Sequence, residues 1–247
     1  MRRSALLSFN LPQGLCCAAL LACAQSTLSP PSGTPAVRLL FVGNSLTSAF
    51  DIPGQVRQMA TATGFTPPVV LTRAYPDFAL EDHWNQGVVQ QDLANGHFDF
   101  MIMQQGASTL PESGVNLTRW TGTWTNEAIK AGTRAGLYVV WAPLGGNLDA
   151  GIANYEAAAN AAGTAIYPVA EAWREASSRD AGMPLYSADG LHPSEHGAWL
   201  AALVITSVIF DRAPRPFPNL YPALISGQQE ATLRAAAAVA VARFARR

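Results

Sequence analysis

Two short segments, far apart in the chain, carry side chains of the types that perform nucleophilic catalysis. The first is 43–45 (Gly-Asn-Ser), directly after an apolar run, and the second is 189–192 (Asp-Gly-Leu-His). A serine hydroxyl attacks a carbonyl when a neighbouring base takes its proton, and an acid must orient that base and stabilise its cation. Ser45, His192 and Asp189 are the residues that could fill these three roles.

Each segment taken alone has a plainer interpretation. A serine after a first strand more often caps a helix or closes a turn, and an isolated Asp-x-x-His is more often a solvated loop. The chain has only four histidines, so His192 in this setting is more informative. A metal site from His192 and His196 is disfavoured, because Pro193 and Ser194 place a helix start between them. We therefore expect no metal there, and hydrolysis through a serine, a histidine and an aspartate would need no cofactor.

The elements that must position these residues follow from the pattern of apolar runs. Runs that are apolar on both faces predict strands over 37–42, 68–74, 98–103, 137–142 and 165–169. Longer amphipathic runs predict helices over 52–62, 87–95, 119–135, 150–162, 169–179, 194–210 and 228–246. This alternation predicts a doubly wound α/β fold. In such a fold, ligands bind beyond the carboxyl ends of the strands.

Composition and charge exclude several classes of protein. The chain has 247 residues, of which 49% are hydrophobic and 13% charged, and this composition excludes disorder for most of its length. A formal net charge of −1 argues against a nucleic-acid partner. All three cysteines lie within the first 23 residues, so the rest of the chain has no disulfide, cysteine zinc site or cysteine nucleophile.

The first residues predict export. Two arginines precede an apolar run too short to span a bilayer, which needs about 20 residues, so the segment 1–23 is typical of a signal peptide. Its end, 20–23 (Leu-Leu-Ala-Cys), resembles a bacterial lipobox, and we expect lipidation at Cys23; plain secretion is the alternative. Residues 24–36 are rich in Ser, Thr, Pro and Gly and predict a flexible linker, leaving one domain over 37–247. We expect a periplasmic or cell-envelope lipoprotein.

The two catalytic segments together resemble a known family. Residues 43–47 (Gly-Asn-Ser-Leu-Thr) and 189–194 (Asp-Gly-Leu-His-Pro-Ser) are similar to blocks I and V of the SGNH hydrolases, the GDSL-like esterases and lipases. The resemblance implies a three-layer αβα sandwich around a five-stranded parallel sheet, of flavodoxin-like type. It also implies Ser45 as nucleophile, with Asp189 and His192 completing the triad.

The middle blocks of that family match less closely. Block II supplies a glycine N–H to the oxyanion hole, but the corresponding segment 75–84 contains no glycine, so a backbone N–H near Asp77 is the candidate. Block III supplies an asparagine amide, and glutamines stand there instead. We expect Gln105, with Gln104 as second choice, to join the N–H of Ser45 as donor. Two turn-forming glutamines are the alternative.

Three residues are candidates for lining a substrate cleft: Gln104, His83 and Trp120. For His83 a buried, hydrogen-bonded histidine is the alternative, and for Trp120 a place in the core. The function implied is hydrolysis of carboxylic esters, acetyl esters of small molecules or glycans among them, at a surface held to the membrane through Cys23. Peptidases and thioesterases use the same triad. The rival function is a carbohydrate-binding surface lipoprotein without turnover.

Overall fold

Five parallel strands form one sheet in the order β2-β1-β3-β4-β5. A computed structural model describes residues 35–244, and the signal, lipidation site and most of the linker predicted above lie outside them. The strands are β1 (Arg38–Gly43), β2 (Val69–Ala74), β3 (Phe100–Met103), β4 (Arg134–Tyr138) and β5 (Ala165–Tyr167). From the central strand β1 the chain passes to the outer strand β2 and then crosses back to β3 on the other side of β1, so the sheet has its switch point between β1 and β3.

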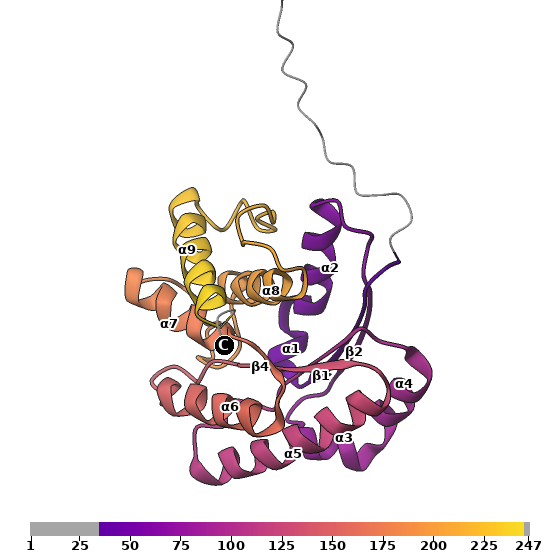
Figure 1. Ribbon diagram of the computed structural model, residues 1–247. Coiled ribbons are helices and arrows are strands. Elements are labelled where there is room, and N and C mark those ends of the chain that lie inside the picture. Colours follow the sequence, from indigo (N-terminus) through magenta and orange to yellow (C-terminus); the bar gives the residue numbers. More distant parts are fainter. Residues whose placement is uncertain (1–34, 245–247) are drawn as a thin grey trace, which may run out of the picture.

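Helices cover both faces of this sheet, which confirms the three-layer αβα prediction (Figure 1). One layer contains α2 (Ile52–Ala62), α7 (Val169–Arg179), α8 (Glu195–Ile209) and α9 (Gly227–Phe244). The other contains α3 (Leu80–Gln86), α4 (Val88–Gly96), α5 (Pro111–Lys130) and α6 (Leu148–Ala162). Two short helices, α1 (Ser45–Ser48) and η1 (Ala49–Asp51), join β1 to α2. In the described part of the chain, no helix is long and apolar enough to cross a bilayer.

The register of the central strands brings their carboxyl ends level. Val42 of β1 pairs with Met103 of β3, and Gly43 pairs with Ala74 of β2. Burial on both faces explains why β1 is an unbroken apolar run, since residues 39–42 have no exposed surface. The loops that follow these three strands therefore open at one edge of the sheet.

The predicted bounds of the fourth strand and the helix before it were wrong. The helix spans Pro111–Lys130, because proline is favoured at the first helical position and Gly132, at φ 71°, follows its end. Strand β4 can then begin at Arg134 and end at Tyr138. The apolar residues 139–142 remain buried beyond the strand. Helices α1 and α3 are too short to show a periodicity, so they were not predicted.

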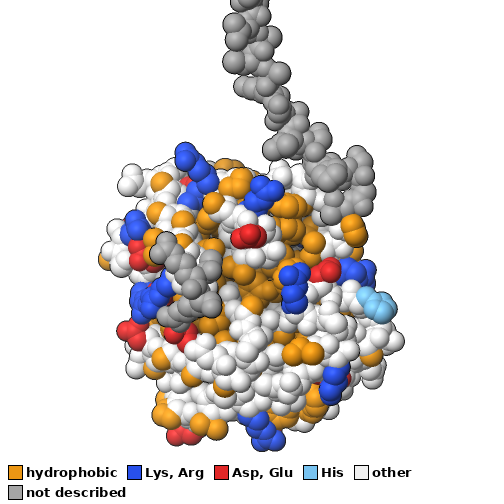
Figure 2. Space-filling model, in the orientation of Figure 1, with side chains coloured by type: hydrophobic (Ala, Val, Ile, Leu, Met, Phe, Trp, Pro, Cys, Tyr) orange, Lys and Arg blue, Asp and Glu red, His pale blue; other side chains and the backbone are white. Residues whose placement is uncertain are grey.

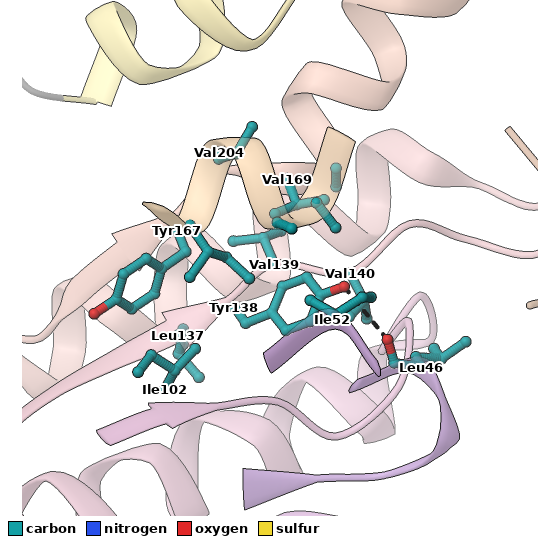
Figure 3. Packing of buried hydrophobic residues seen from close by; sticks show 14 of the residues in the cluster. Leu46, Ile52, Ile102, Leu137, Tyr138, Val139, Val140, Tyr167, Val169 and Val204 are labelled. Carbon is teal, nitrogen blue, oxygen red and sulfur yellow. Dashed lines mark hydrogen bonds between the residues drawn. The ribbon is translucent and has the colours of Figure 1, made fainter. Parts of the chain in front are cut away.

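Side chains from β4, α1 and α2 meet in the core near the switch point (Figure 3). The Tyr138 hydroxyl donates to the backbone oxygen of Leu46 at 3.4 Å, and both side chains are buried. Burial raises the pKa of Tyr138 well above 10, so the hydroxyl keeps its proton and remains a donor. This contact holds α1 against the end of β4.

A hollow of about 640 Å³ lies between the ends of α6, α8 and α9 and the start of β5. Figure 2 shows apolar side chains gathered over α8, between α9 and α2. Ala165, at the amino end of β5, lines this hollow. The hollow therefore lies at the amino ends of the strands, opposite the loops that follow the carboxyl ends of β1 and β3.

Candidate active site

Ser45 is the first residue of α1 and is partly exposed at the carboxyl edge of the sheet. The preceding Asn44 has extended backbone, and its side-chain oxygen accepts from the N–H of Leu46 at 3.1 Å, which caps α1. Gly43 is required here because a Cβ would lie 2.5 Å from Thr47 Oγ1. The sharp exit from β1 places the Ser45 hydroxyl beyond the end of the strand.

Asp189 and His192 occupy one tight loop. Asp189 Oδ1 accepts from the N–H groups of Leu191 and His192, at 2.9 Å each, and Gly190 adopts φ 67°, a backbone conformation that favours glycine. Asp189 Oδ2 lies 2.6 Å from His192 Nδ1. The backbone of the loop therefore orients the carboxylate of Asp189, and the carboxylate in turn orients the imidazole of His192.

The loop meets α1 across the edge of the sheet. His192 Nε2 lies 2.9 Å from Ser45 Oγ, so the three predicted residues form one chain of hydrogen bonds. The ionised carboxylate of Asp189 only accepts, so Nδ1 carries the imidazole proton and Nε2 is left to accept from the Ser45 hydroxyl. The hydrogen bond from His192, followed by those from the two backbone N–H groups, lowers the pKa of Asp189 from 3.8 to about 2.

An aromatic brace supports the loop. Trp141 Nε1 donates to the backbone oxygen of Leu191 at 2.9 Å, and the Trp141 ring stacks on Trp173 with centroids 3.8 Å apart. The N–H of Leu144 donates to Gly190 O at 2.8 Å. Sequence reasoning assigned Trp141 to a strand and missed this role, since nothing in its local pattern indicates the partner 50 residues away.

Asp77 lies in a turn beside the nucleophile. The N–H of Phe78 donates to Tyr75 O at 3.2 Å, and Asp77 adopts φ 63°, the left-handed conformation that glycine takes without strain. The Asn44 amide donates to Phe78 O at 3.1 Å and ties the turn to the residue before Ser45. The turn is thus built with a glycine-like backbone, but it carries an exposed carboxylate.

The two glutamines after β3 do not lie as predicted. Gln105 Nε2 donates to Ser108 Oγ at 3.3 Å and lies 3.5 Å from Ser113 O, so its amide is engaged with the start of α5 instead of Ser45. The prediction of Gln105 as an oxyanion donor was wrong for this arrangement. Gln104 has no exposed surface and bonds Asn44 and Thr47, so it cannot line a substrate cleft.

His83 and Trp120 are also buried, as in the alternative interpretations. His83 Nε2 donates to Gly43 O at 2.8 Å, and burial lowers the pKa of its imidazole. Its ring packs against Phe78 at 5.1 Å. Trp120 is 5% exposed and packs near Trp84 at 6.0 Å. Because both side chains are buried, neither can line a substrate cleft as predicted. Among residues 35–244, no three His, Cys, Asp or Glu residues gather as a metal site.

Comparisons with known proteins bear on the fold. No protein-family model matches the chain, and no curated protein matches it. A candidate SGNH hydrolase from Slackia heliotrinireducens is 28% identical, with a TM-score of 0.62 over 71% of this chain and 100% of its own. A DUF4886 family protein from Bacteroides uniformis is 18% identical, with a TM-score of 0.70 over 84% and 95%. An acetyl xylan esterase from Geobacillus stearothermophilus is 14% identical, with a TM-score of 0.53 over 71% and 93%. The five-stranded parallel sheet with helices on both faces is the fold of the SGNH hydrolases.

Proposed function

We propose that the chain is an SGNH-type serine esterase that cleaves carboxylic esters through an acyl-enzyme. The observation that carries the proposal is the chain of hydrogen bonds from Asp189 through His192 to Ser45. Its order matches the order in which the proton must move, because only the nitrogen that faces Ser45 is free to accept a proton. The likeness to esterases in fold supports the same reaction class.

Acylation would proceed at the carboxyl edge of the sheet. Ser45 Oγ bonds to the ester carbonyl carbon while His192 Nε2 takes the hydroxyl proton, and the Asp189 carboxylate stabilises the imidazolium. The carbonyl π electrons move to its oxygen, which accepts from the N–H of Ser45 and a backbone N–H near Asp77. The carbon–oxygen bond to the alcohol then breaks, and the alcohol leaves with the proton from His192.

Deacylation would repeat these steps with water. His192 Nε2 takes a proton from water as its oxygen bonds to the acyl carbon, and the bond to Ser45 Oγ breaks as Oγ regains that proton. The products are a carboxylic acid and an alcohol, and the enzyme returns to its starting state. No redox partner is consumed in the cycle.

Acetyl esters of small molecules or glycans are the substrate class that we propose to test first. One of the similar structures is an acetyl xylan esterase, which supports this choice. We also propose export and lipidation at Cys23. Labelling of cells with a palmitate analogue tests the second point: the wild-type chain should take up the label and the Cys23→Ala variant should not.

Active-site labelling tests the enzymatic proposal. The domain is incubated with a fluorophosphonate, the adduct is located by mass spectrometry, and hydrolysis of p-nitrophenyl acetate is followed. We expect an adduct on Ser45 and loss of turnover in Ser45→Ala. Ser48→Ala is the matched control, because Ser48 is an exposed serine of the same helix and should leave both readouts unchanged.

A carbohydrate-binding protein without turnover is the second candidate function. Two features favour it. The exposed carboxylate of Asp77 would repel a negatively charged oxygen, and the Gln105 amide, which is engaged with Ser108, does not donate to one. Absence of an adduct on Ser45 together with absence of hydrolysis would contradict the esterase and favour this candidate.

A further inference from the structure

A buried amide joins the loops that follow β1 and β3. Gln104 is the first residue after β3 and has no exposed surface. Its Nε2 donates to Asn44 Oδ1 at 2.7 Å and to Thr47 Oγ1 at 2.9 Å, while its Oε1 accepts from the N–H of Gly106 at 2.8 Å. A primary amide is the side-chain group that offers two donors on one atom and an acceptor on the other.

Gln104 determines which way the Asn44 amide faces. Asn44 Oδ1 receives two donors, Gln104 Nε2 and the N–H of Leu46, so its oxygen must point to them. The Asn44 nitrogen must then point the other way, where it donates to Phe78 O at 3.1 Å. Because Asn44 is 8% exposed, water offers little alternative for either atom.

This relay crosses the three loops at the carboxyl edge of the sheet. It runs from Gly106 after β3, through Gln104 and Asn44, to the turn of Asp77 and Phe78 after β2. Asn44 directly precedes Ser45, so the relay fixes the separation between the backbone of the nucleophile and the backbone of that turn. These two backbones carry the N–H groups assigned to the oxyanion.

We propose that Gln104 is a positioning residue of the esterase reaction, acting through Asn44 to hold the N–H groups of Ser45 and Asp77 at the spacing that one oxyanion requires. The inference rests on the proposed function. Gln104 itself touches no reacting atom. Its loss would therefore weaken binding of the transition state more than binding of the ester.

The expected effect is on kcat. Loss of one oxyanion donor lowers kcat about 10²–10³-fold in hydrolases, so displacement of the donors should lower it by roughly 10–100-fold, with KM within about twofold. Gln104→Met removes both donors at nearly the same volume. Asn44→Ser keeps a good helix cap for α1 but is too short to bridge Gln104 and Phe78.

The experiment measures kcat and KM for p-nitrophenyl acetate in Gln104→Met, Asn44→Ser and the double variant, with unfolding midpoints in urea. Gln55→Met is the matched control, because Gln55 is also buried and its amide also makes two hydrogen bonds, to Phe50 O and the Tyr221 hydroxyl. We expect both single variants to lose kcat, and the double variant to lose no more than the larger single loss, because the two residues act in one relay.

Two results would overturn the inference. One is a Gln104→Met enzyme with the kcat of Gln55→Met, and the other is a double variant whose losses multiply. If Gln104→Met does not fold, an unchanged kcat in Asn44→Ser has the same meaning. Failure of the proposed function looks different: turnover would then be absent from the unmodified chain or unaffected by Ser45→Ala.

Discussion

His192 Nε2 lies 2.9 Å from Ser45 Oγ, and residues 138–141, at the end of β4 and just beyond it, contact the residue next to each of them. The Tyr138 hydroxyl donates to the backbone oxygen of Leu46, and Trp141 Nε1 donates to that of Leu191. One short stretch of chain thus holds both sides of the Ser45–His192 contact. The separation of nucleophile and base depends on the core, although both groups lie at the surface.

Replacing Asp189 by asparagine should reverse the tautomer of His192. The asparagine amide would donate to Nδ1, so the imidazole proton would move to Nε2, which could no longer accept from Ser45. We expect kcat to fall about 10³–10⁴-fold. Steady-state kinetics measure the fall, and circular dichroism should show an unchanged fold. A loss of less than tenfold would contradict the assigned role of Asp189.

The same carboxylate predicts how folding stability depends on pH. Folding lowers the pKa of Asp189 from 3.8 to about 2, so the folded state favours the ionised form. The stabilisation is present above pH 3.8 and is lost as the pH falls through about 2. It should be small, since the side chain is 50% exposed. Urea unfolding of the wild-type protein and of Asp189→Asn measures the free energy of unfolding of each. The difference between the two free energies at pH 5 should shrink towards pH 2, and a difference that grows would contradict this prediction.

The Trp141 brace can be tested with a matched pair of tryptophans. Trp141→Phe removes the donor to Leu191 O, and should lower the free energy of unfolding by about 1–3 kcal/mol and kcat several-fold. Trp173→Phe is the control, because Trp173 stacks on the Trp141 ring but its Nε1 has no hydrogen-bond partner among residues 35–244. It should lower stability while leaving kcat within about twofold. Equal losses of kcat in both variants would mean that only packing matters.

Asp77→Gly should improve both stability and turnover. Glycine takes φ 63° without strain, so we expect a gain of up to about 1 kcal/mol, and loss of the carboxylate should raise kcat several-fold by removing repulsion of the oxyanion. His97→Gly is the control, because His97 has φ 48° at the end of α4 and is far along the chain from Ser45 and His192. This variant should gain stability without a change in kcat. A fall in kcat for Asp77→Gly would show that the carboxylate assists the reaction.

The fold could be predicted because its signals are local. Apolar runs such as 39–42 identify strands buried on both faces, and their alternation with amphipathic runs identifies the layers. The bounds of β4 could not be predicted, because the apolar residues 139–142 are as buried as a strand but lie beyond the sheet. Hydropathy reports burial and does not distinguish these two cases.

The candidate site divides in the same way. From the sequence alone, the resemblance of residues 43–47 and 189–194 to two blocks of the SGNH hydrolases predicted Ser45, Asp189 and His192, because each block is a short-range pattern. Only the tertiary structure decided that the Gln105 amide is engaged with the start of α5, that His83 and Trp120 are buried, and that Gln104 bonds Asn44. The direction of a polar side chain depends on the donors and acceptors that packing brings to it, and those come from loops that the chain order keeps apart.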